Sequence, residues 1–323
     1  MMFSSGVRRL LTLALCAFPA AAVAQGYPSK PIRIIVPFVA GGATDILARL
    51  VGQNLTAAWG QQVIIDNRPG ANGIIGGEIT AKAPPDGHSL LFVAIGHAIN
   101  PLLQKNMPYD TKKDFTPISL AAVLPLIVTV HPSVPVANVR ELIRLAKTSP
   151  RRLNYASGGI GSSQHLATAL FAYSAKLDLG HVPYKGGNQG LIDLVSGQVD
   201  MMISTILSLT QHVKSGRLKA LAITTLARSR AWPDLPTVAE SGLPGYQSLA
   251  WYGLVGPKNL PPDVLKKLGD ETSRIIKSTE VSENLSAQGA DPVGSTPAEF
   301  GAFIKAETNR YAQVVRVTGV AAE

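Results

Sequence analysis

The sequence predicts an α/β fold of two domains with largely parallel sheets. Short runs rich in β-branched residues alternate with amphipathic helical patterns nearly throughout the chain, which is typical of α/β folds. The chain has 323 residues, more than a single hydrophobic core usually supports. Three turns that join a predicted strand to a predicted helix are rich in glycine and small hydroxyl residues.

The N-terminal residues 1–24 have the features of a secretory signal peptide. A short basic start precedes the apolar run 10–18, and Ala22 and Ala24 supply the small side chains that a signal peptidase requires. We expect cleavage between Ala24 and Gln25 and a periplasmic location. The alternative, a membrane anchor, is disfavoured because about 9 apolar residues are too few to cross a hydrocarbon core of ~30 Å.

The first part of the mature chain predicts three strands and a helix. Residues 32–36 form a buried β-branched run, and residues 63–65 and 90–93 are similar. Between the first two runs, apolar residues keep helical spacing from Ile46 to Leu55. This order of elements is the start of a parallel α/β sheet.

The remaining elements follow the same two periodicities. Strands are predicted at 126–131, 153–156, around Val182, and at 199–204, 218–224 and 249–255. Helices are predicted at 139–147, about 162–175, 262–277 and 297–316, the last beginning after Ser295 and Thr296.

Two crossings between the domains are expected. Leu124-Pro125 indicates a break near 124–126, and the pair Pro233 and Pro236 indicates a return near 226–236. The first domain would then be discontinuous, comprising residues 25–124 and 228–323, and the second domain would comprise residues 125–227.

Composition excludes several classes of function. The only cysteine, Cys16, lies inside the predicted signal peptide, so the mature chain has no disulfide, thiolate metal site or cysteine nucleophile. Removing Arg8 and Arg9 lowers the formal net charge from +9 to +7. The basic residues are scattered and aromatic residues are scarce, so nucleic-acid binding is disfavoured. A positive field would favour capture of small anions, although a merely soluble basic surface explains the charge equally well.

The three glycine-rich turns are residues 37–45, 156–163 and 183–188. Each places free backbone N–H groups at a helix N-terminus, where an anion binds favourably. The alternative is that each turn only caps its helix. The candidate ligand-binding residues in these turns are Phe38, Gly42, Ala43, Thr44, Asp45, Gly158, Gly159, Ser162, Ser163, Tyr184, Gly186 and Gly187. Asp45, at the start of a helix, is expected to serve the helix dipole.

The turns match no nucleotide or hydrolase motif. Gln164 stands where a dinucleotide loop needs its third glycine, and neither a P-loop ending nor a nucleophile elbow occurs. No two histidines have the spacing of a local metal site. We therefore expect no metal, no cofactor and no catalytic residue. His97 and His165 are kept as candidate ligand-binding residues because they lie near strand ends and small residues.

At these turns the chain resembles the extracytoplasmic solute receptors of tripartite tricarboxylate transporters, the Bug family. The resemblance runs from Tyr27 to about Gly319. Its landmarks include the segments 66–71, 85–87, 97–101, 154–157, 165–167, 182–186, 197–200, 234–240 and 251–254. It implies a two-domain periplasmic binding protein that closes on a small carboxylate. It also implies that one carboxylate of the ligand lies between the first and second turns.

The chain departs from the family pattern at four residues in three places. Ala40 replaces a proline in the first turn, and Ile160 replaces a polar residue in the second. Ser204 and Thr205 stand where the family commonly has an acidic residue and asparagine, and both are candidate ligand-binding residues. Without that acid, the ligand is expected to carry no ammonium group, although Asp200 could still reach the cleft.

These observations favour a non-catalytic receptor that delivers a carboxylate to the permease of a tripartite transporter. A second interpretation is an orphan receptor that signals to a membrane sensor or another partner protein. A third, a secreted hydrolase or lyase, is disfavoured because the sequence offers no triad, metal cluster or cysteine.

Overall fold

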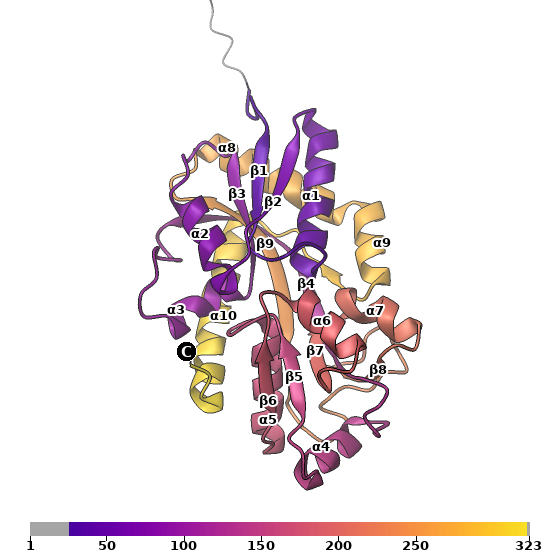
Figure 1. Cartoon of the computed structure of the whole chain (residues 1–323). Coiled ribbons are helices and arrows are strands. Elements are labelled where there is room, and N and C mark those ends of the chain that lie inside the picture. The colour runs from indigo at the N-terminus through magenta and orange to yellow at the C-terminus, as the bar shows by residue number, and fades with distance from the viewer. Residues whose placement is uncertain (1–25, 322–323) are drawn as a thin grey trace, which may run out of the picture.

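The computed structural model describes residues 26–321, so the predicted signal peptide lies outside the described residues. The chain forms two lobes, each with its own sheet, and both sheets include the long strand β4 (Phe115–Val130). Figure 1 shows the two lobes one above the other, with β4 and β9 (Leu249–Pro257) running between them.

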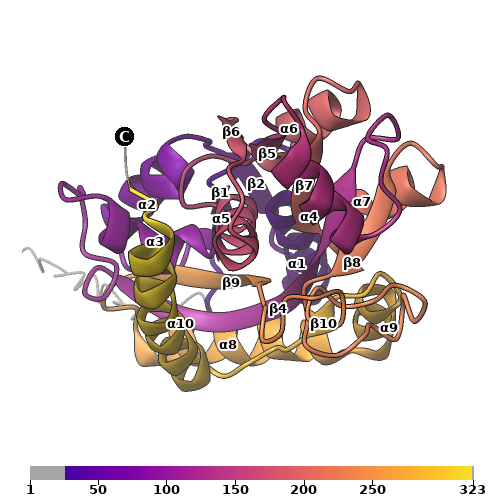
Figure 2. The same cartoon turned by 90° about the horizontal axis from the view of Figure 1, so that it is seen from below.

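The first lobe is built on β1 (Ile32–Val36), β2 (Val63–Asn67), β3 (Ser89–Ala94), β9 and the first part of β4, with β10 (Asp291–Pro292) at its side. The strand order is β2-β1-β3-β9-β4. Its helical elements are α1 (Ala43–Trp59), η1 (Ala71–Gly73), α2 (Ile74–Ala81), α3 (Gly96–Leu103), α8 (Pro262–Lys277), α9 (Thr279–Ala287) and α10 (Pro297–Thr318). Figure 2 shows α8, α9 and α10 on one side of β4 and β9.

The second lobe is built on the end of β4 with β5 (Asn154–Ser157), β6 (Gly180–Pro183), β7 (Met201–Thr205) and β8 (Lys219–Ile223). Its strand order is β4-β7-β5-β6, and β8 pairs with β4. Its helices are α4 (Val139–Thr148), α5 (Ser163–Ala175), α6 (Gly187–Val195) and α7 (Ile206–Lys214).

The sheets are mixed, so the expectation of largely parallel sheets is corrected. β1 pairs in parallel with β2 and β3, and β5 pairs in parallel with β6 and β7. β4 and β9 are antiparallel to each other, and their other strand partners are antiparallel to them. The reason is topological: β4 carries the chain out of the first lobe and β9 carries it back alongside.

The outward crossing is at Pro125, whose strand partner is Leu249. The return was expected near residues 226–236. In the structure, Ile223 N–H donates to the Pro236 carbonyl and Val238 N–H donates to the Ile223 carbonyl. Residues 236–238 therefore lie beside the end of β8, still in the second lobe, and the chain returns at the start of β9. The buried Thr224 hydroxyl contacts the carbonyl oxygens of Leu126 and Ser248 at 3.0 and 2.6 Å, which joins the two crossing strands.

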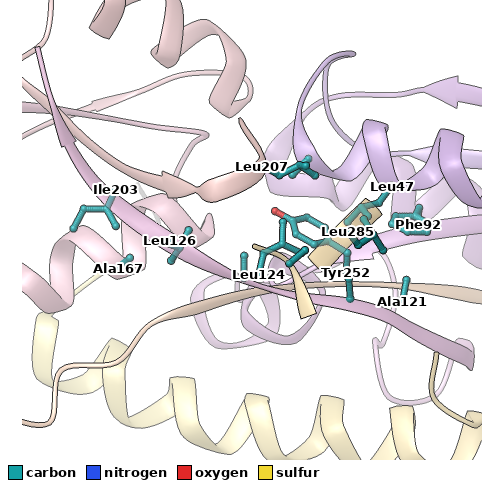
Figure 3. Packing of buried hydrophobic residues seen from close by; sticks show 14 of the residues in the cluster. Leu47, Phe92, Ala121, Leu124, Leu126, Ala167, Ile203, Leu207, Tyr252 and Leu285 are labelled. Carbon is teal, nitrogen blue, oxygen red and sulfur yellow. The ribbon is translucent and has the colours of Figure 1, made fainter. Parts of the chain in front are cut away.

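One hydrophobic core extends through both lobes along the crossing strands. Leu126, Leu124 and Ala121 follow one another along β4, from near the second-lobe residue Ile203 to near the first-lobe residue Phe92 (Figure 3). All five side chains are buried. The lobes therefore share buried apolar surface where they meet, and burial of such surface stabilises the fold.

We expect residues 25–124 expressed alone to remain unfolded. They would lack β9, which covers the open edge of β3 in the whole chain, and α8, which packs against α1. Buried residues such as Leu90 and Phe92 would lose part of their core. Circular dichroism during thermal melting tests this. A cooperative transition in the fragment would contradict a first domain completed by the C-terminal segment.

Among residues 26–321, no helix combines the length and the apolar character needed to cross a bilayer.

Candidate functional site

A cleft of about 240 Å³ lies where the two lobes meet. The carboxyl ends of β1 and β3 in the first lobe and of β5, β6 and β7 in the second lead directly into this region. Five helices begin around it, namely α1, α3, α5, α6 and α7, and residues at each of these N-termini line the cleft. Ligands of α/β proteins bind at the carboxyl ends of strands, and helix N-termini favour anions.

The first turn is organised by Asp45, which is only 3% exposed. Its carboxylate accepts hydrogen bonds from the Gly41 N–H at 3.0 Å and from Arg49 Nε at 2.9 Å. It also accepts one from Asn67 Nδ2 at 2.9 Å. The Gly41 N–H is thereby used internally. The N–H groups of Ala43 and Thr44, in the first turn of α1, have no intrahelical acceptor, and both residues line the cleft.

Asp45 is charged in the folded protein. Burial alone would raise the pKa of Asp45, but hydrogen bonds from Arg49, Gly41 and Asn67 hold it below the usual value. The carboxylate therefore stabilises the fold above the unfolded-state pKa of about 3.9. This contribution is lost as the pH falls through the lower folded-state pKa. Asp45 is thus a support of the first turn, and it does not line the cleft.

The second turn presents Ser162 and Ser163 to the cleft. Ser162 is the N-cap of α5, and its hydroxyl oxygen accepts from the His165 N–H at 3.2 Å. Since this oxygen is an acceptor in the cap, its O–H proton is available as a donor. Ser163 lies in the first turn of α5, where its N–H has no intrahelical acceptor. The two serines can therefore cap the helix and donate to an anion together.

Gln164 joins the second turn to the strand beside it. Its Oε1 accepts from the Gly158 N–H at 3.1 Å, and its Nε2 donates to the Ser204 hydroxyl at 3.2 Å. Ser204, a predicted site residue, is 1% exposed and lies behind the cleft wall. Its neighbour Thr205 does line the cleft, at the N-terminus of α7, and its hydroxyl lies 2.9 Å from that of Ser208.

The third turn contacts the first across the space between the lobes. A Cβ atom on Gly186, whose φ is +148°, would lie 2.7 Å from Val39 Cγ2. A Cβ atom on Gly41 would lie 3.4 Å from Asn188 Nδ2. The backbone of each turn therefore lies in contact with a side chain of the other turn. Gly187 and Asn188 form part of the cleft wall.

The cleft wall carries no carboxylate, lysine or arginine among its described residues. The sequence left open that Asp200 contacts the ligand. In the structure, Asp200 does not line the cleft. It pairs with Arg151 and accepts from the Asn154 N–H at 2.8 Å. The cleft therefore offers neutral donors to a ligand and no acid to an ammonium group. Burying an uncompensated ammonium is costly, so the arrangement suits an anion.

The sequence candidates divide into two groups. Those that line the cleft are Phe38, Gly42, Ala43, Thr44, Gly158, Ser162, Ser163, Gly187 and Thr205. Those that lie outside its lining are Asp45, His97, Gly159, His165, Tyr184, Gly186 and Ser204. Gly159 and Tyr184 line a neighbouring depression, together with Lys185, and the Tyr184 hydroxyl donates to Asp193 at 2.6 Å.

The two histidine candidates pack inside the protein. His97 is 7% exposed and lies edge-on to Phe115, with ring centroids 4.9 Å apart. Burial lowers the pKa of His97 to about 4. His165 stacks on His181 at 4.0 Å, and its Nδ1 accepts from the Gly161 N–H at 3.1 Å. Burial and the adjacent His181 lower the pKa of His165 to about 3, so it is a neutral support for the second turn.

Other residues that line the cleft were not predicted. They comprise apolar residues, polar residues and two glycines. The apolar residues are Val39, Ile46, Ala94, Ile95, Leu191 and Leu207; the others are Gly41, Asn72, Gly96, Gln164, Ser208, Gln211, His212 and Tyr252. Gly96 and Gln164 follow the ends of predicted strands, and this position could have identified them as candidate cleft residues. Tyr252, on the crossing strand β9, belonged to a recognised family segment, but its position in the cleft depends on tertiary structure.

Within residues 26–321, no three side chains of the metal-ligating types His, Cys, Asp and Glu come together.

Replacing both Ser162 and Ser163 by alanine is expected to raise the dissociation constant of a bound carboxylate by at least about tenfold. Each hydrogen bond to a charged group contributes roughly 1.5–3 kcal/mol. Titration calorimetry measures the affinity, and thermal melting checks that the variant folds despite the lost cap. An unchanged affinity would assign both serines to capping alone.

Comparison with known proteins agrees with this geometry. A family model described as "Tripartite tricarboxylate transporter family receptor" matches residues 47–320. The protein BugT of Bordetella pertussis (strain Tohama I) is 35% identical over 313 residues, which cover 95% of this chain and 95% of BugT.

Two solved structures are also similar. An R. palustris protein in a structure with adipate is 35% identical with a TM-score of 0.89, covering 91% of this chain and 99% of that one. MatC from Rhodopseudomonas palustris, with bound malate, is 32% identical with a TM-score of 0.84, covering 90% and 100%. These similarities confirm the predicted fold class, a two-lobed solute-binding fold of the periplasmic binding protein type.

Proposed function

The chain belongs to the tripartite tricarboxylate transporter receptor family, and from this premise we propose that it is a periplasmic receptor for a small carboxylate. In this proposal the ligand is enclosed between the lobes and delivered to the permease of a tripartite transporter. The predicted signal peptide supports the location. The receptor acts by binding and release, with no cofactor and no covalent chemistry.

The observation that carries the proposal is the concentration of neutral donors around one cleft. N-terminal turns of helices from both lobes line it, and the hydroxyls of Thr44, Ser162, Ser163 and Thr205 are added to their free N–H groups. A carboxylate placed among these groups interacts favourably with the helix dipoles and needs no cationic side chain. Because donors come from both lobes, such a ligand favours the closed arrangement.

The bound adipate and malate of the two similar structures support the same class of ligand. One of these ligands has an apolar middle and the other a hydroxyl group. The cleft of this chain offers surfaces for both, since Ile46 and Leu191 are apolar and Ser208 carries a hydroxyl.

Native mass spectrometry of the freshly purified protein tests the proposal. We expect a retained ligand whose mass, after release and identification, corresponds to a small mono- or dicarboxylic acid. If the protein is isolated empty, the same instrument measures binding of added adipate and malate. Retention of an amine or a nucleotide, or no binding of any carboxylate, would contradict the proposal.

A further inference from the structure

A row of polar side chains on α7 lines the part of the cleft that leads away from the glycine-rich turns. Thr205, Ser208, Gln211 and His212 all line it. Ser208 follows Thr205 by three residues, and Gln211 and His212 follow Ser208 by three and four residues. Side chains at this spacing lie on one face of a helix. With a rise of 1.5 Å per residue, the row covers about 10 Å. The cleft is therefore longer than a site for a single carboxylate.

His212 stands at the far end of this row with an unused polar atom. Its Nδ1 is buried and has no hydrogen-bond partner among the described residues. Nδ1 is enclosed by protein atoms, so a ligand cannot reach it. Nε2 is not among the buried atoms without a partner, so Nε2 is the ring nitrogen that can donate to a ligand in the cleft once it carries a proton. His212 is also the one described residue of the cleft wall that can become a cation. It lies in the last turn of α7, where the helix dipole favours positive charge.

The cleft lining also contains apolar side chains from both lobes. Ile46 of α1, Leu191 of α6 and Leu207 of α7 all line the cleft. Figure 1 shows α6 and α7 in the second lobe below the lower end of α1. A ligand that extends from the glycine-rich turns to His212 would therefore need a polar group at each end and a less polar chain between them.

We propose that His212 is a specificity-determining residue, which donates a hydrogen bond to a second carboxylate at the far end of the ligand. The proposal rests on the proposed carboxylate-receptor function and narrows it to dicarboxylates. The first carboxylate lies among the helix N-termini of α1 and α5, where the cleft is neutral. The second lies beside His212, which alone among the described residues of the wall can provide a positive charge.

Binding of a dicarboxylate then takes up a proton. Burial, followed by the positive charge of Arg217, lowers the pKa of His212 in the free protein. The strands β4 and β7, which pack against α7, contain no titratable residue within their bounds. Lys214 is the remaining charged residue of α7 itself. A ligand carboxylate beside the imidazole would favour its charged form, so dicarboxylate affinity should rise as the pH falls toward the range where His212 titrates.

Calorimetric titration of the full mature chain with adipate, malate and hexanoate tests this. Hexanoate has the chain length of adipate but one carboxylate. At about pH 6, the wild-type protein should bind the better dicarboxylate at least about tenfold more tightly than hexanoate. Repeating the titration in buffers of different ionisation enthalpy should reveal proton uptake with the dicarboxylate only.

The variant His212→Gln keeps a donor but cannot become charged. We expect it to lose most of the dicarboxylate preference and the proton uptake, with hexanoate affinity changed by less than about twofold. His131→Gln is the matched control, because His131 contacts Ser133 at the end of β4 and does not line the cleft. It should behave as wild type.

The outcomes separate the two proposals. Equal weakening of hexanoate and dicarboxylates in His212→Gln, or proton uptake that persists in this variant, would overturn the role of His212. So would a wild-type protein that binds hexanoate as tightly as both dicarboxylates. A wild-type protein that binds none of the three acids would overturn the carboxylate-receptor function itself.

Discussion

Asp45→Ala is expected to weaken carboxylate binding by at least about 100-fold, although Asp45 does not line the cleft. The substitution removes the acceptor of the Gly41 N–H, of Arg49 and of Asn67. The first turn would then no longer hold the N–H groups of Ala43 and Thr44 in place for the ligand. Loss of two hydrogen bonds from these groups to a carboxylate costs about 3 kcal/mol or more. Titration calorimetry measures the affinity.

Asp66→Ala is the control for Asp45→Ala. Asp66 lies on the adjacent strand β2 and pairs with Arg33 and Arg68, outside the cleft. Its removal should change the affinity by less than about twofold, because neither Asp66 nor its partners Arg33 and Arg68 line the cleft. If Asp45→Ala folds and binds its ligand as well as Asp66→Ala does, the support assigned to Asp45 is contradicted.

Gly161→Ala is the second substitution with a large expected effect, through closure of the lobes. Gly161 adopts φ +76°, and an added Cβ would lie 2.8 Å from Leu103 Cδ1 and 2.9 Å from Asn72 Nδ2. Both contacts are with the first lobe, so the methyl group opposes closure. Together with the cost of left-handed backbone, about 1–2 kcal/mol, it should weaken ligand affinity by about tenfold to 100-fold.

Gly216→Ala separates backbone strain from closure. Gly216 has φ +72°, nearly the same as Gly161, but an added Cβ would meet nothing within 4 Å. Both variants should lose stability by a similar amount, as measured by the free energy of unfolding. Only Gly161→Ala should lose affinity. Equal affinity in the two variants would show that Gly161 plays no part in closure.

Local patterns predicted most of the secondary structure. The residues of β1 and α8 agree with the predicted ranges 32–36 and 262–277. The predicted start of α10 is confirmed by the capping box of Thr296 and Glu299. In each case the signal is contained in a few neighbouring residues, a β-branched run or a cap.

The local sequence patterns did not predict the features that depend on contacts between distant parts of the chain. β4 passes through Pro125 as one strand of 16 residues, whereas the sequence predicted only a strand at 126–131, after the expected crossing. Proline is tolerated at this point because Pro125 lies where β4 leaves its pairing with β9 and begins its pairing with β7. α2, α3, α7 and α9 were not predicted. α2 and α3, for example, contain only eight residues each, and α3 includes Pro101.

For the candidate site, the sequence identified the backbone groups of the cleft wall, but it did not identify the side chains that meet there across the fold. The glycine-rich turns identified the helix N-termini that line the cleft. The roles of His165 and Ser204 as supports depend on their contacts with Gly161 and Gln164. His212 was treated as an ordinary histidine, because nothing in the sequence near it shows that α7 borders the cleft.

A thermal-shift screen of carboxylates against amino acids tests the central claim most directly. The claim is that the cleft selects an anion with neutral donors and has no acid to compensate an ammonium group. Simple di- and hydroxycarboxylates should raise the melting temperature, whereas aspartate and glutamate, which carry similar carboxylates and an ammonium group, should not. Stabilisation by aspartate or glutamate without stabilisation by the simple carboxylates would contradict it.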